Sequence, residues 1–76
     1  MKDILTAALA RFGVTPDEVQ PDTSLIDLEI DSLAQVELAH LLQDSLGFAV
    51  GDDEFTVRTT VGELLGLLDA KAAATG

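Results

Sequence analysis

Residues 27–47 read "DLEIDSLAQVELAHLLQDSLG" and contain the start, the body and the end of one amphipathic helix. Their apolar residues recur at intervals of three and four, which places them on one side of a helix. These residues are Ala34, Leu38, Ala39, Leu41, Leu42 and Leu46. Gly47 suits the left-handed conformation that ends many helices. We therefore predict a helix from about Ser32 to Leu46 with a broad apolar face.

The opposite side of this helix should face water, yet it also carries two apolar residues. Its side chains are Ser32, Leu33, Val36, Glu37, His40, Gln43 and Asp44. An apolar centre with a charged rim is typical of a protein–protein interface. Single exposed apolar residues are also common on surfaces that bind nothing. Position alone leaves both interpretations open.

The rest of the chain predicts further helices. Residues 3–12 have helical apolar spacing, with Asp3 as a candidate cap and Gly13 after the end. In the long connection that follows, "TPDE" allows one short turn, and several apolar residues should pin the connection to the helices: Leu25, Ile26, Leu28 and Ile30. Residues 53–57 predict a short third helix. The last helix should begin with a capping box at Thr60 and run to about residue 72.

We therefore expect an all-α fold. It is a small four-helix bundle, with three main helices plus one short helix and a long loop between helices one and two. The 76 residues suffice for one small domain, so residues 1–76 should form a single domain whose residues 73–76 fray. Apolar residues make up 47% of the chain without any Trp or Tyr, which predicts an aliphatic core.

The net charge and the residue composition narrow the classes of function that the chain can have. The net charge is −10, and no Lys or Arg occurs between Phe12 and Val57. Such a surface repels nucleic acid and anionic membranes and attracts basic proteins, although it also simply keeps a small protein in solution. The absence of Cys excludes disulfides, thiolate metal sites and a cysteine nucleophile. Without a transmembrane run or a signal peptide, we expect a cytoplasmic location.

No catalytic constellation is visible. Ser32 and the only histidine, His40, would be about 12 Å apart along one helix, too far for a nucleophile–base pair. The "GDDE" of residues 51–54 lacks the spacing of a calcium loop, and we expect no metal site. A phosphate at Ser32 would be favoured by the helix N-terminus, although Asp31 would repel it.

Residues 28–33, "LEIDSL", resemble the L-G-x-D-S-L motif of acyl carrier proteins, the freestanding carriers of fatty acid or polyketide synthesis. The similarity continues through "VEL" at residues 36–38 and "TTV" at residues 59–61. Length, acidity, helix order and the long first loop also match, so the resemblance covers nearly the whole chain. The D-S-L triplet alone is weak, whereas the triplet within this layout is specific.

The resemblance implies that Ser32, flanked by Asp31 and Leu33, receives a 4′-phosphopantetheine arm from coenzyme A. Acyl groups would ride on the thiol of this arm as thioesters. This would let a chain without cysteine serve thioester chemistry, as a substrate of enzymes and not as an enzyme itself.

The resemblance also implies a set of partners. The side chains expected to face them are Leu33, Val36, Glu37, His40 and Asp44. The partners would be a phosphopantetheinyl transferase and enzymes such as a ketosynthase, an acyltransferase or a reductase, each with a basic docking patch. We expect a monomer that binds no nucleic acid and inserts into no membrane.

Four residues depart from the family pattern, one of which is Gly51, where proline is frequent. Glu29 occupies the position of the motif glycine, where glycine often provides a positive φ, so we expect strain or an altered path there. His40 stands where an apolar residue is frequent, and Ala34 where an acidic one is, which bears on partner identity. Two alternatives remain: a peptidyl carrier protein, whose G-G-[HD]-S-L pattern does not fit residues 29–30, and an acidic helical adaptor that is never modified.

Overall fold

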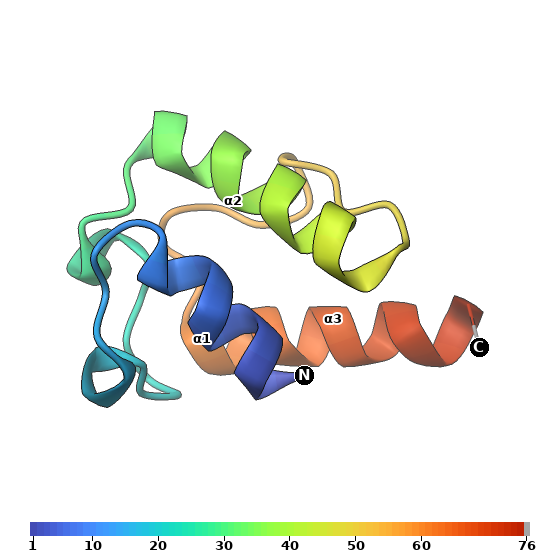
Figure 1. Cartoon of the computed structure of the whole chain (residues 1–76), viewed down its shortest axis with the longest axis horizontal. Helices are drawn as coiled ribbons and strands as arrows, with labels where there is room; N and C mark the ends of the chain where they lie inside the picture. Colours follow the sequence, from blue (N-terminus) through green and yellow to red (C-terminus); the bar gives the residue numbers. More distant parts are fainter. Residues whose placement is uncertain (76) are drawn as a thin grey trace.

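The computed structural model describes residues 1–75 and is built from three helices joined by two long connections (Figure 1). The elements are α1 (Lys2–Ala10), the 3-10 turns η1 (Pro16–Glu18) and η2 (Ile26–Leu28), α2 (Ser32–Leu46) and α3 (Val61–Thr75). The described residues contain no strand beyond one isolated bridge between Ser24 and Thr60. The predicted all-α fold with three main helices is confirmed. Helix α2 has the predicted limits.

An aliphatic core lies between the helices. Its largest fully buried side chains are Leu5, Leu9, Val19, Leu25, Ile30, Leu38, Leu42, Val50, Val61, Leu64 and Leu68. Burying each of these side chains contributes about 1.5–3 kcal/mol of hydrophobic stabilisation. All three helices and both connections supply members of this core. The connections are therefore integral to the packing.

The first connection, residues 11–31, is held by its own apolar side chains and by backbone pairing. Gly13 has a φ of 84°, the left-handed conformation expected of a glycine after a helix. Farther along, the N–H of Leu25 donates to the carbonyl of Thr59 (3.0 Å) and the N–H of Ile26 to that of Val57 (2.8 Å). In return, the N–H of Val61 donates to the carbonyl of Thr23 (2.9 Å). The chain before α2 is thereby tied to the chain before α3.

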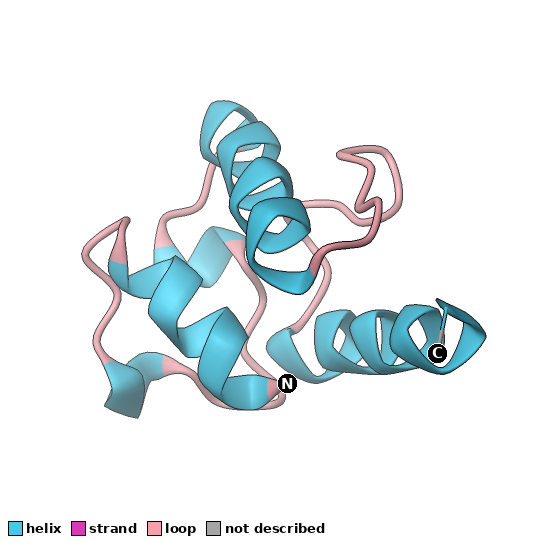
Figure 2. Ribbon diagram, turned by 45° about the vertical axis from the view of Figure 1, so that its right-hand side comes forward, coloured by secondary structure: helices cyan, strands magenta, loops and turns pink. Residues whose placement is uncertain are grey.

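The second connection, residues 47–60, forms turns and bends (Figure 2), so the predicted short helix over residues 53–57 is wrong. In a helix the N–H of Thr56 would donate to the carbonyl of Asp52. It donates instead to the Thr59 hydroxyl oxygen (3.0 Å), while the Asp52 carbonyl accepts from the Gln35 side chain (2.7 Å). Threonine side chains often compete with helices in this way. The short helical elements of the fold are the 3-10 turns of the first connection.

The remaining helix limits follow local capping chemistry. The capping box of α3 is present, with the N–H of Thr60 donating to Glu63 Oε1 (2.9 Å) and the N–H of Glu63 donating to Thr60 Oγ1 (3.2 Å). Asp3 does not cap α1, because Met1 occupies the cap position and Asp3 lies within the first turn. Helix α1 ends two residues earlier than predicted and α3 extends to Thr75.

The predicted fraying of residues 73–76 stays a prediction. Gly76 lies outside the described residues. Within the described part of the chain, no helix is both long and apolar enough to span a bilayer.

Candidate functional site

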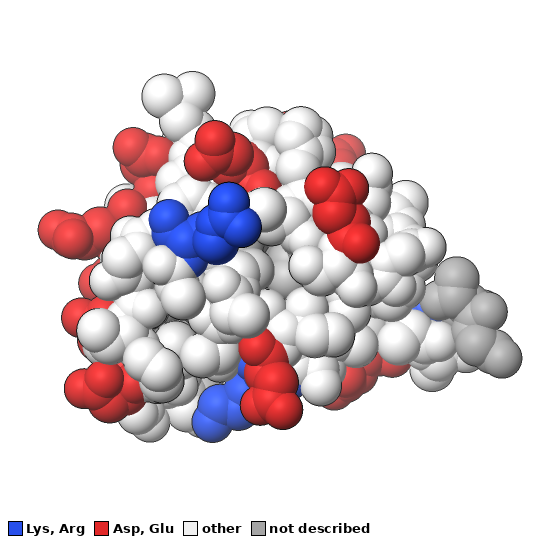
Figure 3. All heavy atoms as spheres, in the orientation of Figure 1, with Lys and Arg blue, Asp and Glu red and all other residues white. Residues whose placement is uncertain are grey.

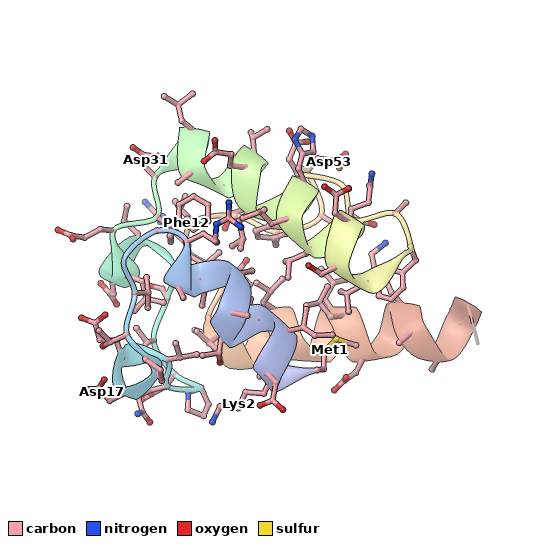
Figure 4. The ribbon with its side chains drawn as sticks, viewed as in Figure 1. Met1, Lys2, Phe12, Asp17, Asp31 and Asp53 are labelled. Atoms are coloured by element: carbon pink, nitrogen blue, oxygen red, sulfur yellow. The ribbon has the colours of Figure 1, made fainter. Side chains whose placement is uncertain are left out.

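Asp31, not Ser32, caps helix α2. The Asp31 backbone is extended, and its Oδ1 accepts a hydrogen bond from the N–H of Ala34 at 2.8 Å. Figure 4 shows Asp31 where the chain enters the helix. Ser32 is therefore the first helical residue, and its side chain is exposed. The Ser32 hydroxyl has no hydrogen-bond partner within residues 1–75, so it is available to react.

The first turn of α2 also offers free backbone donors. The N–H of Ala34 is occupied by Asp31, whereas those of Ser32 and Leu33 have no acceptor in the described part of the chain. Unpaired N–H groups and the positive end of the helix dipole both stabilise phosphate oxygens. The Ser32 hydroxyl oxygen and these two N–H donors lie on one turn and fit a phosphodiester. The sequence also suggested a phosphate at this position, despite the neighbouring Asp31 carboxylate.

The chain enters this turn through a strained residue. Glu29 has φ 65° and ψ 25°, and it is the only non-glycine residue with a positive φ in residues 1–75. Its N–H donates to the carbonyl of Ile26 (3.0 Å) at the end of η2. The left-handed conformation costs a non-glycine residue about 1–2 kcal/mol. The expected strain at the motif glycine position is thus confirmed, and the turn it makes leads directly to the fully buried Ile30.

Exposed apolar side chains occur on the two elements beside this turn. Leu33 is 82% exposed and Val36 is 37% exposed, as the helical spacing predicted. Ile26 is 49% exposed, so the prediction that it pins the first connection is wrong. Its neighbours Leu25 and Leu28 are buried and occupy the inward side of the single 3-10 turn, so Ile26 faces outward. Sequence reasoning could have found this from the turn geometry, had η2 been predicted.

The acidic and polar residues predicted to surround these apolar side chains are also exposed. Glu37, His40 and Asp44 lie on the outer side of α2. Neither Glu37 nor Asp44 pairs with a Lys or Arg of the described chain, where the recorded ion pair joins Lys71 to Glu54 (2.7 Å). Acidic side chains outnumber basic ones on the face shown in Figure 3. The carboxylates of α2 are therefore free for a basic partner.

Gln35 supports the site and was missed by sequence reasoning. Its Nε2 donates to the carbonyl oxygens of Asp52 (2.7 Å) and Phe55 (2.6 Å), so it ties the first turns of α2 to the second connection. No signal in the sequence marks a glutamine for this role, because both acceptors are backbone atoms far along the chain. Among residues 1–75, no group of three or more His, Asp or Glu side chains is arranged to hold a metal ion.

Comparison with known proteins places this geometry in context. The family model described as a phosphopantetheine attachment site matches residues 2–68. The chain is 39% identical over 54 residues to the meromycolate extension acyl carrier protein of Mycolicibacterium aurum, covering 70% of this chain and 56% of that protein. It is 41% identical over 54 residues to the acyl carrier protein of Rhodococcus erythropolis, covering 70% and 59%.

A third relative is matched over a larger share of its length. The acyl carrier protein of Chlamydia trachomatis is 33% identical over 64 residues, which is 83% of each chain. The chain otherwise spans little more than half the length of the curated relatives described above. No solved structure matches it significantly.

Proposed function

The chain belongs to the acyl carrier protein family, whose domain attaches phosphopantetheine, and from this premise we propose that Ser32 carries the 4′-phosphopantetheine arm. The observation that carries this assignment is the free, exposed hydroxyl of Ser32 in the first turn of α2. Asp31 takes over the capping role, so Ser32 can be modified without uncapping the helix. The arm supplies a thiol that holds acyl groups as thioesters.

Each neighbouring residue has a defined part in this proposal. The N–H groups of Ser32 and Leu33 stabilise the phosphate charge, which offsets repulsion by Asp31. Ile30 is fully buried and anchors the chain two residues before the attachment point. The serine is thereby held on a fixed turn while its side chain stays in solvent.

The outer side of α2 is the surface on which partner enzymes dock in this proposal. Leu33 and Val36 supply apolar contact, and Glu37 and Asp44 face a basic patch on the partner, with His40 beside them. The partners are a phosphopantetheinyl transferase and synthase enzymes such as a ketosynthase, an acyltransferase or a reductase. Attraction between opposite charges raises the association rate more than it raises the affinity, so these contacts are brief.

The cargo is an acyl intermediate of fatty acid or polyketide synthesis. Relatives whose names specify acyl carriage, including meromycolate extension, support an acyl over a peptidyl cargo. The sequence Glu29-Ile30 before the motif also differs from the double glycine of peptidyl carriers.

A mass measurement tests the attachment site. The purified protein is incubated with coenzyme A, Mg²⁺ and a broad-specificity phosphopantetheinyl transferase, and its intact mass is recorded. We expect one added arm on the wild type and none on Ser32→Ala. Ser45→Ala is the matched control, because Ser45 is an exposed serine near the other end of the same helix.

The outcomes separate the alternatives. An arm on Ser32→Ala would move the site to another residue. No arm on the wild type, under conditions that modify a known carrier, would contradict the carrier function and favour an adaptor that is never modified.

A further inference from the structure

Two apolar side chains that solvent reaches lie on the two connections, apart from the docking surface on α2. Ile26 is 49% exposed, and Val57 is half-buried. The N–H of Ile26 donates to the carbonyl of Val57 at 2.8 Å, so these two residues, distant in the sequence, are neighbours in the fold. Neither of them takes part in the attachment or docking roles proposed above.

Arg58 follows this apolar pair and adds a positive charge to it. Its side chain is exposed, and its guanidinium forms no ion pair with the described residues. It is the only basic residue between Arg11 and Lys71. We call Ile26, Val57 and Arg58 the connection surface. A purely basic patch, which suits the outer side of α2, would be repelled by Arg58, whereas a carboxylate would be attracted to it.

The connection surface lies close to Ser32 on the side of the first connection. The N–H of Ile30 donates to the carbonyl of Leu25 at 3.0 Å, which folds the chain before Ser32 back against η2. Through this bond, the dimensions of the backbone limit the distance between the Cα atoms of Ile26 and Ser32 to about 15 Å. Figure 1 shows the short loop that joins η2 to the start of α2.

The second connection approaches Ser32 from another side. Gln35 lies three residues after Ser32 on α2, and its Nε2 donates to the carbonyl of Phe55 at 2.6 Å. Phe55 precedes Val57 by two residues. Hydrogen bonds therefore link η2, residues 55–57 and the first turns of α2, and the attachment point lies between the connection surface and the docking surface on α2.

Partner enzymes act at two different distances from Ser32. A phosphopantetheinyl transferase must bring coenzyme A to the Ser32 hydroxyl itself. The Ser32 oxygen bonds to the phosphorus next to the pantetheine, the bond from that phosphorus to the oxygen of the second phosphate breaks, adenosine 3′,5′-bisphosphate leaves, and the hydroxyl proton passes to a base of the transferase. A synthase enzyme acts on the thiol of the arm, which extends on the order of 15 Å, by the reach of a peptide of similar size. The transferase therefore has to contact the protein close to Ser32, whereas a synthase enzyme does not.

We propose that the connection surface is a contact site for the phosphopantetheinyl transferase, which presents an apolar side chain to Ile26 and Val57 and a carboxylate to Arg58. The inference rests on the proposed attachment at Ser32. It divides the partners into two groups. The transferase uses the connection surface together with the outer side of α2, and synthase enzymes use the outer side of α2 alone.

The rate of loading tests this surface. The protein is mixed at subsaturating concentration with coenzyme A, Mg²⁺ and the broad-specificity transferase, and intact mass against time gives kcat/KM. Ile26→Ala and Arg58→Gln should each lower kcat/KM by about three- to tenfold, as the loss of a contributing interface side chain does. Lys2→Gln is the control for Arg58→Gln, because it removes the same charge from an exposed residue that Figure 4 shows at the opposite edge of the molecule from Asp31. It should leave the rate unchanged.

A second reaction, at the thiol, makes the test specific. Each variant is loaded to completion, as intact mass confirms, and is then given malonyl-coenzyme A and a malonyl-transferring acyltransferase. We expect Ile26→Ala and Arg58→Gln to be malonylated at the rate of the wild type. Val36→Ala changes the outer side of α2 and should slow both the loading and the malonylation.

The outcomes separate this inference from the attachment proposal. Wild-type loading of either Ile26→Ala or Arg58→Gln would overturn the connection surface. An equal loss in loading and malonylation, or an equal loss in Lys2→Gln, would overturn it too. A wild-type chain that takes no arm would contradict the attachment at Ser32 instead, and the mass spectrum shows this before any variant is compared.

Discussion

The two connections between helices are similar in role but are stabilised in different ways. The first connection buries five apolar side chains, namely Val14, Val19, Leu25, Leu28 and Ile30, and pairs its backbone with residues 57–62. The second connection buries only Val50 and Phe55 and depends on polar side chains from the helices, which are Gln35, Gln43 and Lys71. The connection that ends at Ser32 is thus fixed mainly by burial. The second connection shares the backbone bonds through Val57 and Thr59, whereas its residues 49–55 are held by a few individual hydrogen bonds.

This difference predicts how each connection fails. Removing one buried side chain from the first connection should destabilise the whole domain, because that side chain belongs to the common core. Removing one polar side chain beside the second connection should release that segment while the attachment turn stays in place.

The largest effect is expected from Ile30→Ala. Ile30 is fully buried two residues before Ser32, and a large-to-small change at such a site costs about 2–5 kcal/mol. Urea unfolding followed by circular dichroism measures the loss. Ile26→Ala is the control on the same connection, where exposure predicts a change within about 0.5 kcal/mol. Equal losses in both variants would contradict stabilisation by burial.

A smaller and more local effect is expected from Gln35→Ala. The variant loses two hydrogen bonds and leaves the carbonyls of Asp52 and Phe55 without their donor, which costs about 1–3 kcal/mol. Hydrogen exchange should accelerate in residues 51–56, which contain both acceptors of Gln35, more than in residues 21–31. Gln43→Ala removes a single 3.2 Å bond to the N–H of Val50 and should cost less. Uniform acceleration across both connections would refute the proposed independence.

Glu29→Gly should strengthen the one weak point of the first connection. Relief of left-handed strain gains about 1–2 kcal/mol, and the greater freedom of glycine in the unfolded chain offsets about 0.5–1 kcal/mol of it. The expected net gain in the free energy of unfolding is on the order of 0.5–1 kcal/mol. Glu29→Ala keeps the strain and should remain near wild type. A less stable glycine variant would show that the Glu29 side chain has a favourable role.

The smallest effect is expected on the stability of the domain at acidic pH. Hydrogen bonding from Lys71, and next from the N–H of Gly51, lowers the pKa of Glu54 below its ordinary 4.5. The unfolded chain therefore binds this proton more readily, so the stabilisation is present above pH 4.5 and is lost as the pH falls through the folded pKa. Subtracting the pH–stability curve of Glu54→Gln from that of the wild type isolates this contribution. A difference that grows on acidification would contradict the assignment.

The sequence correctly predicted the structural features that depend on residues close together in the chain. The limits of α2, the left-handed Gly13 and the capping box at Thr60 each follow from residues within one turn. The exposure of Leu33 and Val36 followed from helical spacing alone.

One error arises where a distant residue competes with local structure, and one choice was left open between adjacent residues. The predicted helix over residues 53–57 fails because Gln35, about twenty positions away, takes a carbonyl that the helix would need. At the attachment turn, Asp31 and Ser32 are both good caps, and the sequence offers no basis for choosing between them. The structure distinguishes them by the bond from Ala34 to Asp31.

The backbone hydrogen bonds between the first connection and residues 57–62 can form only after the ribosome has made both segments. A ribosome releases Ser32 well before the partners of Leu25 and Ile26, which are Thr59 and Val57, have been made. A nascent chain should therefore expose the serine on a loop that has no fixed shape. We expect the arm to be added only after residues 57–62 have been made and have paired with the first connection.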